Sequence, residues 1–227
     1  MLGTIVNFIT ILLGGIIGVN IKNGLKENYK KIIMDSLALI VIVIGLTSAL
    51  KTENLLVVIF SLVLGAILGE LLKIDKRLNN LGDFLERKLG RNDTNFSKGF
   101  VTTSLIFCVG AMAIVGSLES GLTGNHNTLY AKSVIDGVTS IVFASTLGIG
   151  VAFSAISVFL YQGTITILAS SLSEFLVDSV VLEMSAVGGI LIVAIGINIL
   201  ELKEIKVSNM LPGIFLPLIF YIFKLAF

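Results

Sequence analysis

The chain has 227 residues, of which 55% are hydrophobic and 14% charged, and its formal net charge is +1. A soluble globular domain carries about 25% charged residues, and a nucleic-acid surface needs a basic excess, so both classes are excluded. The single cysteine, Cys108, excludes a disulfide framework and a thiolate metal site within one chain.

Long apolar runs indicate helices that cross a bilayer, since a helix needs about 20 apolar residues to span the hydrocarbon core. We predict an all-α polytopic transmembrane bundle of about eight spans in a single integral membrane domain, residues 1–227. The predicted spans are 2–20, 33–50, 54–72, 99–117, 133–148, 151–171, 182–200 and 208–226. The short fifth span and the Gly148-Ile149-Gly150 hinge also allow one broken or re-entrant element, and hence seven crossings.

Most Lys and Arg residues lie in predicted loops 21–32, 73–98 and 201–207. Basic loops face the cytoplasm, so the N-terminus is expected outside, and with eight spans the C-terminus as well. Loop 73–98 also repeats apolar residues among its basic ones, which predicts an amphipathic helix on the inner leaflet. A solvated linker is the alternative.

Three segments near the start of the chain resemble three near its end. The matches are LGTIVNF (2–8) with LGIGVAF (147–153), ALIVIVIG (38–45) with GILIVAIG (189–196), and NLLVVIF (54–60) with NMLPGIF (209–215). With eight crossings the copies, about 1–72 and 149–227, run in opposite directions on either side of the central region 99–148. This predicts inverted repeats, an architecture common in transporters; with seven crossings the copies would be parallel.

The fifth span carries Asp136, about one turn in from its predicted outer end. An ionisable side chain in a span is costly and usually faces the protein interior or water. Thr139 and Ser140 follow at helical spacing, so Asp136 and these hydroxyls form an oxygen-rich surface that suits Na⁺. Alternatively, Asp136 lies at headgroup level and pairs with Lys132, four residues earlier.

Small and polar residues form matching stripes on the sixth and first spans. The sixth span has Ser154, Ser157, Tyr161 and the neighbouring Gln162; the first has Asn7, Gly14 and Gly18. Such stripes either let helices pack closely or line a wet path. We therefore place a candidate pathway between these spans. Asn198 of the seventh span joins it as a possible carbonyl ligand or interhelical hydrogen bond.

Other positions predict structure rather than chemistry. The pair Gly65 and Gly69 indicates close helix packing and a possible homodimer contact. Asp35 and Glu183 are expected to begin and cap spans two and seven. Pro212 and Pro217 should kink the last span.

Three stretches resemble a family of bacterial membrane proteins known as YqgA/YdfK-like: MLGTIVNFITILLGGIIGVNI, CVGAMAIVGSLESGL and KSVIDGVTSIVFASTLGIGVAFSAISVFLYQG. The resemblance covers nearly the whole chain. It implies a multi-pass inner-membrane protein, loosely described as a possible Na⁺ channel or pump, and carries no set of functional residues.

No Walker loop, GxSxG, HExxH or CxxC motif occurs, so we expect no enzymatic activity, no cofactor and no bound metal beyond a transported monovalent cation. The expected function is Na⁺ movement as a channel or secondary transporter. The alternatives are transport of a small neutral or zwitterionic metabolite, or a non-transporting protein whose basic loop binds lipid or a partner. Expected partners are the bilayer and a small ion or metabolite, with no nucleic acid.

Overall fold

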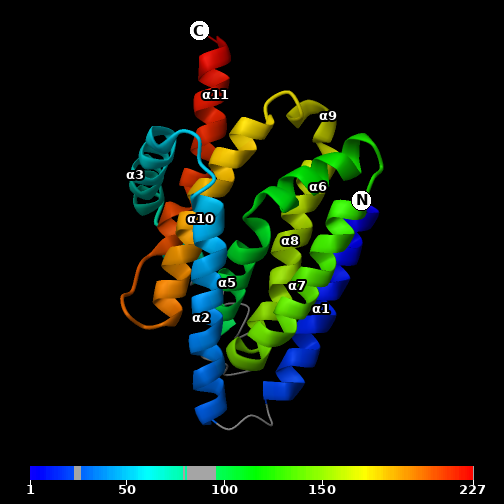
Figure 1. The fold of residues 1–227 in the computed structure, drawn as a ribbon, viewed down its shortest axis with the longest axis vertical. Coiled ribbons are helices and arrows are strands. Elements are labelled where there is room, and N and C mark those ends of the chain that lie inside the picture. Colours follow the sequence, from blue (N-terminus) through cyan, green and yellow to red (C-terminus); the bar gives the residue numbers. More distant parts are fainter. Residues whose placement is uncertain (23–26, 79, 81–95, 227) are drawn as a thin grey trace. The chain divides into compact units, whose positions relative to one another are not determined.

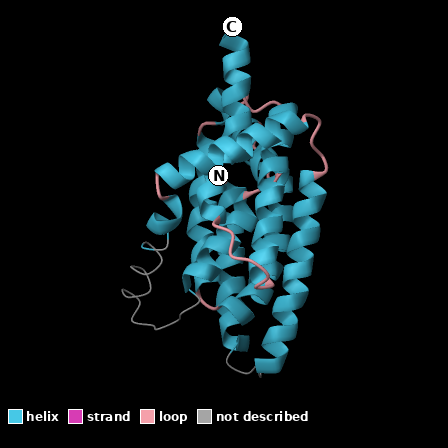
Figure 2. Cartoon of the chain, turned by 90° about the vertical axis from the view of Figure 1, so that its left-hand side faces the viewer, coloured by secondary structure: helices cyan, strands magenta, loops and turns pink. Residues whose placement is uncertain are grey.

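The computed structural model describes all residues except 23–26, 79, 81–95 and 227. Every regular element in this part of the chain is a helix, as Figure 2 shows, so the predicted all-α class is confirmed. The helices are α1 (Leu2–Lys22), α2 (Glu27–Ala49), α3 (Leu55–Leu71), α5 (Phe96–Cys108), α6 (Ala111–Leu122), α7 (Asn127–Leu147), α8 (Gly150–Ile167), α9 (Ala169–Leu172), α10 (Asp178–Ile199), the 3₁₀ helix η1 (Val207–Phe215) and α11 (Leu216–Ala226).

The chain divides into two compact units, each assembled from separate segments. The first unit comprises Met1–Asp35, Leu78–Cys108 and Met112–Ser170, and the second comprises Ser36–Arg77, Val109–Ala111 and Ser171–Phe227. Each unit thus takes segments from both predicted repeats.

In the first unit, α1 packs against both α7 and α8 (Figure 1). The contacts between α1 and α7 follow the same order along both helices, from Gly3 against Leu129 to Gly18 against Ile141. The two helices therefore run in the same direction. Helix α8 runs the opposite way. Gly148, with φ of +82°, makes the tight turn between α7 and α8, in a conformation that favours glycine.

In the second unit, α2 packs against α10 and α3 packs against η1. Gly45 meets Gly189, and Gly196 meets the carbonyl oxygen of Ala38, so α2 and α10 run in opposite directions. The predicted kink of the last span stays a prediction, but the span is not a regular α-helix: Pro212 lies inside η1, and the α-helical geometry of α11 begins only at Leu216.

All eight predicted spans coincide with helices, but not all of these helices are long and apolar enough to cross a bilayer by themselves. Helix α7, the predicted fifth span, has 21 residues but is not among those that are. Four helices are long and apolar enough to cross a bilayer: α1, α2, α8 and α10. A fifth candidate joins α5 and α6, which are bent by 61° at the break between them. Helix α3 and the η1–α11 segment are shorter apolar elements. The count of eight crossings therefore stays a prediction.

Two predicted helix starts are wrong. Helix α2 begins at Glu27, eight residues before Asp35, and α10 begins at Asp178, five residues before Glu183. Neither carboxylate therefore begins its own helix, because the charged and polar residues before them are themselves helical. The predicted amphipathic helix in loop 73–98 falls largely on residues outside the described part of the chain.

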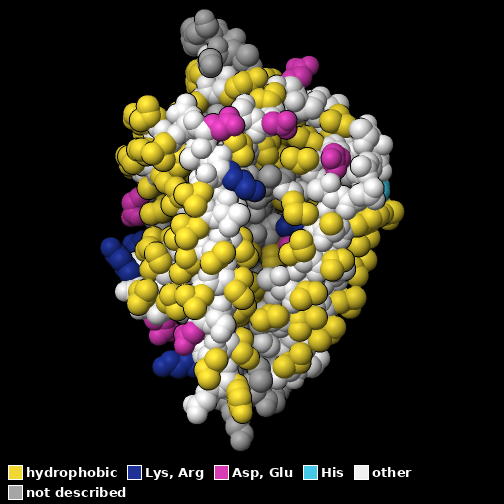
Figure 3. All heavy atoms as spheres, in the orientation of Figure 1, with side chains coloured by type: hydrophobic (Ala, Val, Ile, Leu, Met, Phe, Trp, Pro, Cys, Tyr) yellow, Lys and Arg dark blue, Asp and Glu magenta, His cyan; other side chains and the backbone are white. Residues whose placement is uncertain are grey.

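The helices carry exposed apolar side chains on their outer faces, and they bury small and polar residues together with apolar ones inside. On α1, Leu13 is 53% exposed whereas Asn7 and Gly14 are buried, and on α2 Val43 is 62% exposed whereas Gly45 is buried. Hydrophobic side chains likewise dominate the face in Figure 3. Exposed apolar faces over long apolar helices are those of a membrane-bound protein.

Candidate functional site

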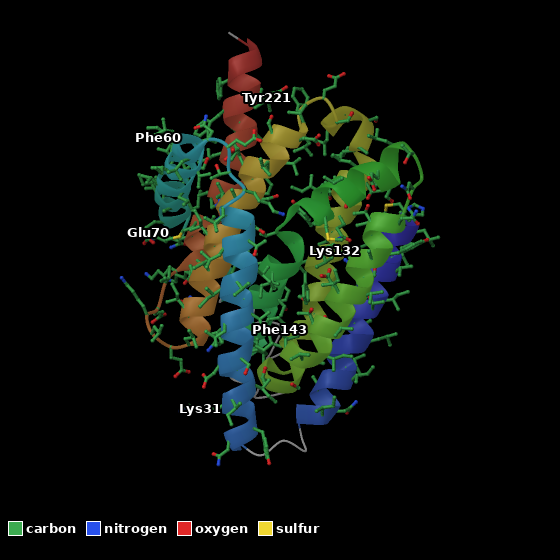
Figure 4. The ribbon with its side chains drawn as sticks, viewed as in Figure 1. Lys31, Phe60, Glu70, Lys132, Phe143 and Tyr221 are labelled. Carbon is green, nitrogen blue, oxygen red and sulfur yellow. The ribbon has the colours of Figure 1, made fainter. Side chains whose placement is uncertain are left out.

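A buried ion pair lies on one face of α7 in the first unit. Lys132 and Asp136 are four residues apart, one helical turn, and the Lys132 Nζ lies 2.9 Å from each carboxylate oxygen of Asp136. Only 7% of Lys132 and 3% of Asp136 is exposed. Figure 4 labels Lys132 on α7. Helix α7 begins at Asn127, six residues before the predicted start of the span, so Asp136 lies more than two turns inside the helix.

Two amides from the neighbouring helices complete this cluster. The Asn7 Nδ2 of α1 donates to Asp136 Oδ2 at 3.0 Å and to the Gln162 Oε1 of α8 at 3.3 Å. Both amide side chains are fully buried. Helix α1 and the consecutive helices α7 and α8 therefore meet at one polar cluster, formed by Asn7, Lys132, Asp136 and Gln162.

Glycines on α1 allow α7 to approach this closely. A Cβ added at Gly14 or Gly18 would overlap the backbone carbonyl oxygen of Gly137 or Ile141. The predicted packing glycines of the first span thus lie at the α1–α7 contact. This close approach brings the short Asn7 side chain within hydrogen-bonding distance of Asp136.

Several buried polar atoms beside the ion pair lack a hydrogen-bond partner among the described residues. They are the Asn7 Oδ1, the Gln162 Nε2 and the Ser140 Oγ, which lies one turn beyond Asp136 on the same helix. Buried polar groups are nearly always hydrogen-bonded, and exceptions often mark the place of a water or an ion. Asn7 Oδ1 and Ser140 Oγ are oxygens, the atoms that hard cations prefer.

The other predicted residues of the first unit lie outside this cluster. Thr139 Oγ1 donates to the Ile135 carbonyl at 2.6 Å on a partly exposed face of α7. Ser154 Oγ donates to the Val151 carbonyl at 2.7 Å, and Ser157 Oγ accepts from Ser104 Oγ of α5 at 3.0 Å. Tyr161 is half-buried on α8, next to Gln162.

Asn198 lies in the second unit and is not part of the cluster. Its amide closes the turn after α10: Nδ2 donates to the Ile205 carbonyl, and Oδ1 accepts from the Ile205 N–H, both at 2.8 Å. Gly65 and Gly69 are also in this unit, where Gly213 and Asn209 of η1 cover them. A homodimer would therefore have to use another face of the chain.

Sequence reasoning missed the role of Glu183, which caps a helix other than its own. Its carboxylate accepts from Thr52 Oγ1 at 2.5 Å and from the backbone N–H groups of Glu53 and Asn54 at 2.8 and 2.9 Å. These groups lie just before α3, so Glu183 of α10 anchors the start of that helix. The buried carboxylate was visible in the sequence, but its partners are about 130 residues away.

Comparison with known proteins identifies relatives along almost the whole chain. Residues 2–222 match the family model described as "Protein of unknown function (DUF554)". The chain is 34% identical over 223 residues to the uncharacterized membrane protein YdfK of Bacillus subtilis, covering 96% of this chain and 94% of that protein. It is 30% identical over 225 residues to the uncharacterized protein YqgA of Escherichia coli, covering 96% and 95%. No solved structure gives a significant match.

Proposed function

Because the chain belongs to the DUF554 family, whose description names no activity, we propose a function from the chain's own geometry. The protein moves a small monovalent cation, foremost Na⁺, across the bacterial inner membrane as a channel or secondary transporter. The proposal includes no catalysis and no resident cofactor. The basic loops face the cytoplasm and the N-terminus faces outward.

The observation that carries this proposal is the buried Lys132–Asp136 pair beside oxygens that lack a partner. A buried ion pair is rarely retained for stability, because apolar residues of similar volume usually do as well. Ionisable residues inside transmembrane segments commonly mark ion or substrate pathways. Asp136 supplies a charged ligand, and Asn7 Oδ1 and Ser140 Oγ supply neutral ones.

In this mechanism Lys132 and the transported cation compete for the same carboxylate. When the site holds no cation, the Lys132 ammonium neutralises Asp136 at 2.9 Å. An arriving Na⁺ displaces the ammonium, so Asp136 keeps a counter-charge. The displaced Lys132 then transfers its proton to water, because an ammonium left beside Na⁺ in the buried cluster would be as costly as an uncompensated carboxylate. Lys132 thereby sets the affinity of the site and makes a bound ion easy to release.

The predicted inverted repeats are part of the proposal, and two contacts in the second unit support them. Gly45 meets Gly189, and Gly196 meets Ala38. In the repeat alignment Ala38 corresponds to Gly189 and Gly45 to Gly196. Exchanging the two copies therefore turns one contact into the other, as expected for segments related by a two-fold axis.

A flux measurement tests the proposal. Full-length protein is reconstituted in liposomes, and ²²Na⁺ uptake is compared with uptake by protein-free vesicles. Asp136→Asn should reduce uptake to the protein-free level, because the charged ligand is lost. Asp178→Asn is the matched control, since Asp178 is exposed at the start of α10. Uptake that survives Asp136→Asn would remove Asp136 from the mechanism.

Transport of a zwitterionic metabolite is the second candidate, favoured by the two opposite charges at the site. Lys132 can bind a carboxylate and Asp136 an ammonium group, as an amino acid would offer. A thermal-shift screen of purified protein separates the two candidates, because a ligand that binds the native state raises its apparent stability. Stabilisation by amino acids with none by Na⁺ would favour the second candidate.

A further inference from the structure

A polar cavity of about 220 Å³ in the second unit collects lysines from two segments of the chain. Its lining residues are Glu70, Lys73, Asp75, Lys76, Lys206 and Asn209. Lys73 and Lys76 follow the end of α3, whereas Lys206 directly precedes η1. All three lysines are exposed, and they outnumber the two carboxylates of the lining.

Asn209 joins the two segments that line this cavity. Its Nδ2 donates to Glu70 Oε2 at 2.6 Å, and its Oδ1 accepts from the Asp75 N–H at 2.8 Å. The backbone of Asn209 also lies directly against Gly69, which leaves no room for a side chain there. The lysines therefore surround a fixed hydrogen-bonded arrangement, in which Asn209 Nδ2 already donates to the Glu70 carboxylate.

An apolar groove adjoins the cavity and shares three of its residues. This groove, of about 470 Å³, is lined by Ala66, Ile67, Leu71 and Met210 together with the shared Glu70, Lys206 and Asn209. Ile67 is 53% exposed and Leu71 74%. Figure 4 labels Glu70 on α3, where the polar and apolar parts meet.

This arrangement of charge beside an apolar groove fits an amphiphile. The charged residues follow an apolar helix directly, which places them at the depth where lipid headgroups lie. Lysines near an anionic membrane surface are attracted to it, and the attraction grows with each added lysine. An acyl chain seated along Ile67 and Leu71 would cover apolar surface that the chain itself leaves exposed.

We infer that this cavity and groove bind an anionic phospholipid, with its phosphate among Lys73, Lys76 and Lys206 and an acyl chain along the α3–η1 groove. The inference does not depend on cation transport, since all its residues belong to the second unit.

The test uses delipidated full-length protein and native mass spectrometry. Phosphatidylglycerol is compared with phosphatidylcholine of the same acyl chains. We expect about tenfold tighter binding of the anionic lipid, and its loss in the triple variant Lys73→Gln, Lys76→Gln, Lys206→Gln. The control triple variant Lys31→Gln, Lys98→Gln, Lys203→Gln removes the same charge from exposed positions outside the cavity and should bind like the wild type.

A second variant separates a lipid site from a simple phosphate site. Ala66→Phe fills the groove but leaves the lysines, so it should weaken phosphatidylglycerol binding and leave that of inorganic phosphate unchanged. Equal binding of both lipids, or equal losses in the two triple variants, would overturn the inference. So would phosphatidylglycerol binding that Ala66→Phe does not change. If the triple variant does not fold, the single variants Lys206→Gln and Ala66→Phe provide the same comparison between the lysines and the groove.

Discussion

Gly45 of α2 and Gly189 of α10 face each other so closely that a Cβ on either would lie 2.6 Å from the other's carbonyl oxygen. Neither position tolerates a side chain without separation of the helices. This contact joins two segments that align in sequence as related copies. A substitution that separates them is therefore expected to lower the stability of the second unit.

Gly189→Ala should destabilise the protein even though alanine favours helix formation. Relief of the clash requires displacement of backbone rather than of a flexible side chain, and overpacking of this kind costs about 1–3 kcal/mol. Gly163→Ala on α8 is the control, because a Cβ there meets only Met1 Cε, at 3.7 Å. Thermal unfolding in detergent should show a lower Tm for Gly189→Ala alone, and equal Tm values would contradict the close contact.

Lys132→Met should destabilise the first unit by about 3 kcal/mol, because it leaves the buried Asp136 carboxylate without its counter-charge. Adding Asp136→Leu should restore most of the stability. Under the proposed competition, NaCl should raise the Tm of Lys132→Met more than that of the wild type, with choline chloride as the ionic-strength control. An equal response of both proteins to Na⁺ would argue against competition at Asp136.

Ser140→Ala should weaken Na⁺ binding with little effect on stability. The Ser140 hydroxyl has no hydrogen-bond partner among the described residues, so its removal breaks no internal bond. Ser133→Ala is the opposite case, since Ser133 Oγ donates to the Leu129 carbonyl at 2.7 Å. Isothermal titration with NaCl and thermal unfolding should separate the two serines. Unchanged Na⁺ affinity in Ser140→Ala would exclude this hydroxyl as a ligand.

Glu183→Ala should loosen the start of α3 by removing the acceptor of two backbone N–H groups and one hydroxyl. The expected loss is about 1–3 kcal/mol, as for other buried donors left without a partner. Hydrogen exchange should accelerate at residues 53–58 and remain unchanged in α1. A uniform acceleration throughout the protein would indicate global destabilisation instead of a lost helix cap.

Accessibility labelling tests the predicted orientation. In a Cys108→Ser background, Asn125→Cys should react with a membrane-impermeant thiol reagent from outside the cell, and Lys203→Cys only after the membrane is opened. Both positions are exposed in loops at helix ends, so folding should tolerate them. Labelling of both from the same side would refute the predicted arrangement of crossings.

The polar cluster was partly foreseeable because charge is rare in an apolar segment. Asp136 stands out in the predicted fifth span, with Lys132 just before that span at helical spacing, and Asn7 and Gln162 lie in segments predicted to adjoin. The joining of Asn7 to both Asp136 and Gln162 was not foreseeable, since it depends on how closely α1 approaches α7.

Two residues whose roles were predicted wrongly show that a local sequence pattern does not identify the hydrogen-bond partner of a side chain. The sequence places Asn198 at the pathway because it is polar in an apolar span, but its partner is the backbone of Ile205 in the following loop. The sequence predicts Glu183 to cap its own helix because it predicts a start at residue 182, whereas α10 begins at Asp178. Polarity at a position is visible in the sequence, whereas the partner depends on tertiary folding.

The cap that Glu183 provides also has a consequence for how the protein is made. Helix α3 has only 17 residues and contacts Glu183 and η1, which the ribosome adds at least 129 residues later. At typical synthesis rates of about 5–20 residues per second, α3 waits on the order of ten seconds for these partners. During that interval α3 lacks both contacts, so its insertion must proceed without the hydrogen bonds that later hold its start.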